Sequence, residues 1–184
     1  VFLADVVGLG KTFISALLAQ QLQGGKLIIC PPVLKKYWED TLRDFNVVNF
    51  EVESLGKLER LKDRSHRYKY VFIDEAHRFR NEYTQGFEDL DLICKGKKVV
   101  LVSATPINNR FDDLLAQLRL FQPLRRSTIP GVPNLEKFFQ SVNKPLRNHE
   151  KGSPEYLDEL KNGAEQIRDK VLSHIMVRRT RTEI

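Results

Sequence analysis

The sequence predicts an α/β domain with a mainly parallel sheet. Short apolar runs of strand length alternate along the chain with amphipathic stretches of helical spacing, which is the pattern of strands joined by crossover helices. The chain has 184 residues, of which 41% are hydrophobic and 29% are charged. This size and composition are typical of one soluble globular domain with a sizeable core.

In the first half of the chain, predicted strands alternate with predicted helices. Residues 1–4 predict a strand, and residues 11–23 predict a helix that Gly24 and Gly25 end. That helix would place Ile14, Leu17, Leu18 and Leu22 on one face. Residues 26–30 predict a buried strand, and the next helix begins at Pro31-Pro32 with Leu34, Tyr37, Trp38, Thr41, Leu42 and Phe45 at helical spacing.

The later elements are a weaker strand at 50–54, a basic helix-and-loop stretch at 57–69, strong strands at 70–73 and 98–102, and an amphipathic helix from Phe111 to Phe121. From Pro123 onward five prolines interrupt a polar, basic region, and helical spacing returns from Tyr156 onward. We therefore divide the chain into a core at residues 1–123 and a helical appendage at residues 124–184, which we expect not to form an independent domain.

Composition narrows the class of protein. No apolar run approaches the roughly 18 residues of a membrane span. Cys30 and Cys94 provide neither a disulfide framework nor a metal-ligand spacing, which favours a reducing compartment. The net charge of +6 favours a polyanionic partner but agrees equally with a basic surface that has none. Because the chain opens on Val1 inside an expected strand, without an initiator methionine, we expect a fragment of a longer protein.

A glycine-rich segment between the first strand and the first helix predicts a phosphate-binding loop. Its candidate nucleotide contacts are Asp5, Gly8, Leu9, Gly10, Lys11 and Thr12. Backbone N–H groups and the start of a helix attract phosphate, Lys11 would reach the β- and γ-phosphates, and the Thr12 hydroxyl would ligate magnesium. Asp5 stands where the common pattern has glycine, so a plain glycine turn before a helix is the alternative.

An apolar strand ends in two adjacent carboxylates, Asp74 and Glu75, followed by Ala76 and His77. Asp74 can hold Mg²⁺, and Glu75 can orient and deprotonate an attacking water. The carboxyl ends of strands are where ligands bind in open α/β sheets. The alternative is an exposed Asp-Glu helix cap. We predict that His77 connects the nucleotide site to a neighbouring element by hydrogen bonds.

A third strand ends in hydroxyls, at Ser103 and Thr105. Both can hydrogen-bond the acidic strand end and couple it to another part of the protein. Taken alone, they fit ordinary capping of a strand-to-loop junction equally well.

These three motifs occur in an order that resembles superfamily-two helicases. Three details are similar to the Swi/Snf-type branch: Asp5 in place of the first loop glycine, Cys30-Pro-Pro-Val-Leu followed by Trp38, and Ile175-Met-Val-Arg-Arg-Thr180. The resemblance covers essentially the whole chain. It implies the first RecA-like P-loop NTPase lobe, with helices on both faces of the sheet and a helical protrusion after Pro123.

The resemblance also implies ATP hydrolysis with Mg²⁺ and translocation along double-stranded DNA by a motor that remodels protein–DNA complexes. The family keeps its arginine finger in a second RecA-like lobe, so we expect this fragment to bind ATP weakly and hydrolyse it poorly. Val6 stands where the family usually has Glu, which leaves Lys11 and Thr12 in place. The protein would be cytoplasmic if bacterial and nuclear if eukaryotic.

In this family the first lobe touches the DNA backbone through its second motif, which here implies contacts by Lys35 and Lys36. Contacts to phosphates give affinity without reading sequence. The alternative for both lysines is a solvated helix face. We expect a solvated surface also for the basic cluster Lys57, Arg60, Lys62, Arg64, Arg67 and Lys69.

Two other functions remain open. A DEAH-type helicase that separates RNA or DNA strands would share the Asp-Glu-Ala-His box, and a non-catalytic nucleotide-binding scaffold would share the fold. A GTPase would need a guanine-reading Asn-Lys-x-Asp, and the single Asn-Lys pair, Asn143-Lys144, lacks that aspartate.

Overall fold

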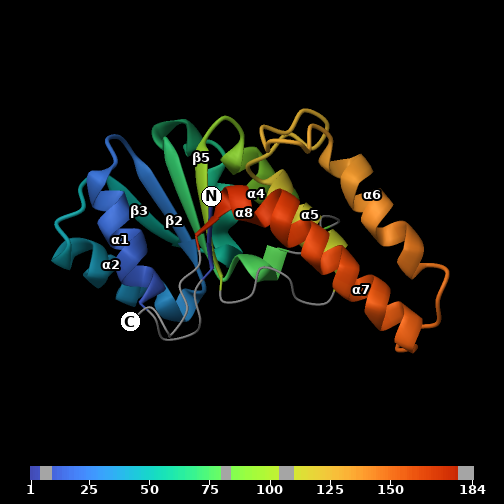
Figure 1. Ribbon diagram of the computed structural model, residues 1–184. Coiled ribbons are helices and arrows are strands. Elements are labelled where there is room, and N and C mark those ends of the chain that lie inside the picture. Colours follow the sequence, from blue (N-terminus) through green and yellow to red (C-terminus); the bar gives the residue numbers. More distant parts are fainter. Residues whose placement is uncertain (5–9, 80–83, 104–109, 178–184) are drawn as a thin grey trace.

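The computed structural model describes residues 1–4, 10–79, 84–103 and 110–177. Within these ranges the chain forms one six-stranded sheet in the order β3-β2-β4-β5-β1-β6, in which all neighbouring strands are parallel (Figure 1). The strands are β1 Phe2–Ala4, β2 Lys26–Cys30, β3 Phe50–Ser54, β4 Tyr70–Asp74, β5 Lys98–Ser103 and β6 Met176–Val177. The predicted α/β class with a parallel sheet is confirmed.

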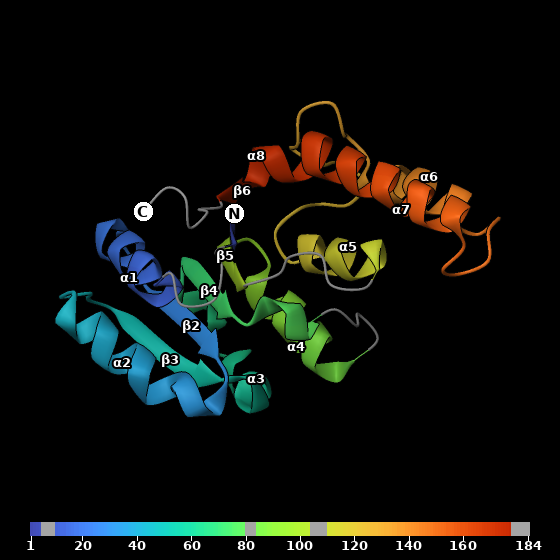
Figure 2. The same ribbon diagram turned by 60° about the horizontal axis from the view of Figure 1, so that its bottom comes forward.

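Helices cover both faces of the sheet, as predicted. Successive residues of a strand point to opposite faces, and the two hydrophobic clusters follow this alternation. Leu27 and Ile29 of β2 belong to the cluster that includes Phe87 and Leu114, whereas Ile28 and Cys30 belong to the cluster that includes Trp38. In Figure 2 the helices α1 (Lys11–Gln21) and α2 (Lys35–Asp44) accordingly lie on one side of the sheet, and α4 (Gln85–Cys94) and α5 (Phe111–Arg119) lie on the other.

The apolar face predicted for α1 is partly wrong. The residues that α1 buries are Ser15, Ala16 and Ala19, while Leu17 and Leu18 remain 48% and 39% exposed. Small side chains let the helix backbone approach the sheet closely, so the larger leucines lie to the side. Helical spacing located the helix but not the face that packs.

Two helices were not predicted. In α4, the Thr84 hydroxyl accepts a hydrogen bond from the backbone N–H of Phe87, which is a cap that the sequence could have revealed. The other, α6 (Leu135–Leu146), lies in the region that we expected prolines to interrupt; Pro145 falls in its last turn. Asn134 caps α6 by accepting from the backbone N–H of Lys137.

The helical protrusion shares its core with the sheet. Phe139 of α6 and Ile167 of α7 (Pro154–Ile167) belong to the same buried cluster as Phe2 and Leu101. A π-helical turn at Arg168–Leu172 and α8 (Ser173–Ile175) then lead the chain back to β6, which pairs with β1 (Figure 1). The boundary at residues 123 and 124 stays a prediction. In the part of the chain that the structure describes, no helix is long and apolar enough to cross a membrane.

Three cations of the basic stretch before β4 form ion pairs. Lys57 stays exposed, as expected of a solvated surface, whereas Lys62 and Arg64 are half-buried. The stretch contains short helical turns at Leu55–Lys57 and Ser65–Arg67 and the helix α3 (Leu58–Leu61). The pairs are Lys57 with Glu53 at 3.9 Å, Lys62 with Asp89 at 2.9 Å, and Arg64 with Glu51 at 2.7 Å. Glu51 and Glu53 belong to β3 and Asp89 belongs to α4, so these cations connect the stretch to β3 and α4.

The Lys62–Asp89 pair should make stability depend on acid pH. Asp89 is buried, and the hydrogen bond from Lys62 holds the pKa of its carboxyl below the ordinary value of 3.8. A depressed folded-state pKa contributes stability above the unfolded value of about 3.9, and this contribution is lost as pH falls through the folded value. We expect Asp89→Asn to flatten the pH dependence of the free energy of unfolding below about pH 4. Urea unfolding measured at several acidic pH values would check this, and an unchanged slope would contradict it.

Candidate nucleotide-binding site

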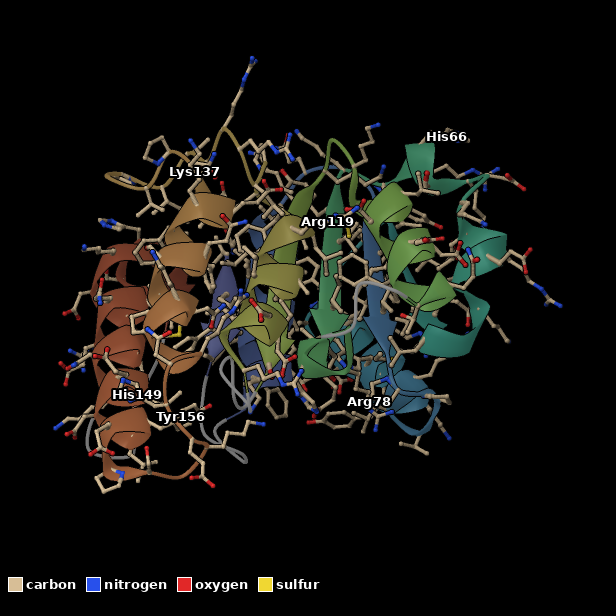
Figure 3. The ribbon with its side chains drawn as sticks, turned by 90° about the vertical axis from the view of Figure 1, so that its right-hand side faces the viewer. His66, Arg78, Arg119, Lys137, His149 and Tyr156 are labelled. Carbon is tan, nitrogen blue, oxygen red and sulfur yellow. The ribbon has the colours of Figure 1, made fainter. Side chains whose placement is uncertain are left out.

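The strand order brings the three predicted motifs to one edge of the sheet. The neighbours β4, β5 and β1 align Asp74 with Val102 and Ser103 with Ala4. The acidic strand end, the hydroxyl strand end and the strand that leads to the glycine-rich loop therefore lie next to one another. Figure 3 shows Arg78, just beyond β4, at this lower edge of the sheet.

The start of α1 has the properties of a phosphate site. Gly10 precedes the helix with φ 73°, a left-handed conformation that favours glycine, and no side chain of the described residues caps the helix. Backbone N–H groups in the first turn of such a helix attract phosphate. Lys11 and Thr12 are the first two residues of α1, whereas Asp5, Gly8 and Leu9 lie outside the described residues.

Asp74 is a buried carboxylate with a donor on each oxygen. The indole Nε1–H of Trp38 donates to its Oδ2 at 2.8 Å, and the backbone N–H of Glu75 donates to its Oδ1 at 2.9 Å. Burial raises the pKa of Asp74 above its ordinary value of 3.8, while the two hydrogen bonds and the positive charge of Lys11 act in the opposite direction. Asp74 is thus held from two sides at the end of β4.

Glu75, His77 and Ser103 form a contiguous polar group. His77 Nδ1 lies 3.1 Å from Glu75 Oε2 and 3.2 Å from Ser103 Oγ. Ser103 is buried, while Glu75 and His77 are partly exposed. The structure therefore places His77 between the carboxylate and the end of β5, and the coupling role of His77 and Ser103 stays a prediction. Thr105, the other predicted coupling residue, lies outside the described residues.

The backbone at Glu75 is unusual. Its φ is 53°, a left-handed conformation that non-glycine residues adopt rarely and that is found at functional sites more often than elsewhere. This turn lets the N–H of Glu75 reach back to Asp74, and its carbonyl accepts from the N–H of Arg78 at 2.9 Å. The turn thereby separates the two carboxylates, leaving Asp74 buried and Glu75 towards solvent.

The residues fit a magnesium–nucleotide complex. A carboxylate oxygen can accept two hydrogen bonds or ligands, so each oxygen of Asp74 keeps one position beyond its protein donor. Mg²⁺ in nucleotide sites is bound by one or two protein oxygens, with phosphates and water completing the shell. Among the described residues, no group of three or more His, Cys, Asp or Glu side chains could hold a metal by itself.

The two predicted DNA-contacting lysines differ in their surroundings. Lys35 Nζ lies 3.2 Å from Oε1 of Glu53, a side chain that also accepts from the backbone N–H of Ser54. Lys36 is exposed, and Val33 nearby is 86% exposed. Lys35 therefore joins α2 to β3, whereas Lys36 remains exposed.

One contact at this site was not predicted from the sequence. Trp38 was expected on the buried face of its helix, where the structure confirms it, but its hydrogen bond to Asp74 was not anticipated. The two residues are 36 positions apart. Only the adjacency of β2 and β4, which no local pattern reveals, brings them together.

Comparison with known proteins agrees with this geometry. The solved SWI2/SNF2 ATPase core of Sulfolobus solfataricus in complex with dsDNA superposes with a TM-score of 0.59 and 26% sequence identity, covering 98% of this chain and 40% of that chain. The match confirms a RecA-like fold. An uncharacterized ATP-dependent helicase of Bacillus subtilis, YqhH, is 30% identical over 171 residues, which cover 80% of this chain and 30% of that protein.

More distant relatives include Helicase SWR1 of Yarrowia lipolytica, which is 26% identical over 180 residues. The match covers 78% of this chain and 10% of that protein. The chain thus spans less than half the length of each of these relatives. The family model described as SNF2-related domain matches residues 39–184, well over half of the sequence. The chain therefore belongs to the SNF2-related domain family.

Proposed function

We propose that this chain is the ATP-binding lobe of a DNA-dependent ATPase that moves along duplex DNA and remodels protein–DNA complexes. The observation that carries the proposal is the parallel alignment of β1, β5 and β4, which places Asp74 and Glu75 at the same end of the sheet as the strand that precedes Lys11 in the sequence. The Sulfolobus neighbour, an ATPase core solved with dsDNA, supports a duplex partner. ISWI chromatin-remodeling complex ATPase CHR11 of Arabidopsis thaliana, 25% identical over 188 residues, supports a remodelling role.

Each residue of the site has a distinct task in this proposal. Lys11 and the first N–H groups of α1 bind the phosphates of ATP, and Thr12 and Asp74 are the side chains that would hold Mg²⁺. Magnesium supplies positive charge to the phosphate oxygens when it is bound. Glu75 orients the attacking water and accepts its proton. His77 fixes the side chain of Glu75 and connects it to Ser103.

The first experiment is an ATPase assay of the full-length protein with duplex DNA, single-stranded DNA, RNA or no nucleic acid. We expect the largest stimulation with duplex DNA, without separation of its strands. Stimulation mainly by RNA or single strands would favour a strand-separating helicase. Failure to hydrolyse ATP under every condition would favour a nucleotide-binding scaffold.

Lys36 should contribute more than Lys35 to DNA affinity. Removing one phosphate contact weakens binding for all sequences and lowers the slope of log affinity against log salt by about 1. We expect this result for Lys36→Ala in the full-length protein, measured by fluorescence anisotropy with duplex DNA at several salt concentrations.

Lys35→Ala is the matched comparison. Because Lys35 pairs with the buried Glu53, its removal should chiefly lower thermal stability. Equal salt slopes for the unsubstituted protein and Lys36→Ala would contradict a phosphate contact at Lys36.

A further inference from the structure

The single tryptophan of the chain lies against the magnesium-holding carboxylate. Trp38 is 1% exposed and packs in the cluster formed by α1, α2 and one face of the sheet. Indole N–H is a donor only, and a buried one needs an acceptor. In this structure the acceptor is Oδ2 of Asp74, at 2.8 Å.

This hydrogen bond limits how the Asp74 carboxylate can turn. With Oδ1 held by the N–H of Glu75 and Oδ2 held by Trp38, both oxygens have a fixed donor on the protein side. The positions that remain open on the two oxygens are then fixed as well. Rotation of the carboxylate would break one of two hydrogen bonds in a site that is only 6% exposed, where water is a poor substitute.

The donor is itself rigid. Trp38 lies on α2, and its ring is held by the same buried cluster as Leu42, one helical turn further along. Loss of a hydrogen-bond partner of a metal ligand typically lowers metal affinity or activity by about 10–100-fold. Trp38 fits such a partner in position, burial and chemistry.

We propose that Trp38 is a positioning residue that orients Asp74 for Mg²⁺ and thereby sets the magnesium dependence of nucleotide binding. This inference rests on the proposed function, since it needs a nucleotide at this edge of the sheet. It extends the site from the three strand-end motifs to helix α2.

The test compares full-length protein with its Trp38→Phe variant. Calorimetry would measure the affinity for the β,γ-imido analogue of ATP with Mg²⁺ and with excess chelator. We expect the gain in affinity due to Mg²⁺ to fall by about tenfold or more in Trp38→Phe, because the carboxylate loses its fixed donor. Affinity in chelator should be unchanged, because the one N–H of the Trp38 indole is buried and donates to Asp74, so it is not a donor to the phosphates.

Two further variants separate positioning from packing. Leu42→Val trims the same cluster without removing a donor, and should keep the full magnesium gain. Replacement of Trp38 by β-(3-benzothienyl)alanine keeps the ring shape and removes only the N–H, so it should reproduce the loss seen with Trp38→Phe even where that variant folds poorly.

The outcomes are distinct. A full magnesium gain in the benzothienyl protein would overturn the positioning role, even if the nucleotide binds as proposed. An equal loss in Leu42→Val would assign the effect to packing and also overturn it. Absence of nucleotide binding by the unsubstituted protein would overturn the proposed function itself, and this inference with it.

Discussion

Replacing Glu75 with Gln is expected to lower ATP turnover by about 10²–10⁴-fold, the usual contribution of a general base. The amide has nearly the shape of the carboxylate but cannot accept the proton of the attacking water. Nucleotide affinity should stay unchanged, because Lys11 and the start of α1 bind the phosphates. Steady-state ATPase of the full-length protein with duplex DNA, together with calorimetric binding of the β,γ-imido analogue, would check both parts.

Gln is the informative substitution because of the backbone at Glu75. The φ of 53° is strained for any non-glycine residue, and a β-branched or bulky replacement would add strain that obscures the chemistry. Gln keeps the side-chain length, and its amide oxygen can still meet His77. A loss of turnover without a loss of folding would therefore report on proton transfer.

The matched control is Glu39→Gln on α2. Glu39 lies 3.8 Å from Arg43 in a surface pair one helical turn away, and such pairs contribute little. This variant should retain the turnover of the unsubstituted protein. If Glu75→Gln also retained the turnover, Glu75 would have no part in the chemistry. That result would favour a nucleotide-binding scaffold over an ATPase.

The sheet could be predicted from the sequence because each central strand is apolar on both faces. Strands β2 and β4 are buried throughout, so their continuous apolar runs are visible without knowing their partners. The chemistry of the site was predictable for a related reason. Its residues directly follow strands, and parallel strands end at a common edge.

The interactions that we did not predict from the sequence join residues that are far apart in the chain. Lys62 and Asp89 are 27 positions apart, and Trp38 and Asp74 are 36 apart. Periodicity identifies a buried face but not the polar partner that a buried N–H or ammonium group will find. The prediction of a leucine face on α1 was wrong for a similar reason. Small residues such as Ala16 and Ala19 let the helix approach the sheet closely, and this approach determines which face packs.

The approach of β2 to β4 depends on Gly25. A Cβ added at Gly25 would lie 2.2 Å from the backbone carbonyl oxygen of Arg67, a distance that no rotamer change can relieve. The Gly25 carbonyl also accepts from the N–H groups of Lys69 at 2.8 Å and Tyr70 at 3.2 Å, so this contact joins the segments that begin β2 and β4. Lys26 and Tyr70 are the first aligned pair of residues between the two parallel strands.

We expect Gly25→Ala to destabilise the protein by about 3 kcal/mol and to lower its melting temperature by roughly 6–12 °C, since the clash involves backbone on both sides. Gly56→Ala is the matched control, because a Cβ there would meet nothing within 4 Å. Differential scanning calorimetry of both variants would check the difference, and equal melting temperatures would contradict the close approach. Because the register set beside Gly25 continues along β4 to Asp74 and along β2 towards Trp38, a Gly25→Ala protein that still folds should also bind nucleotide with a reduced magnesium gain.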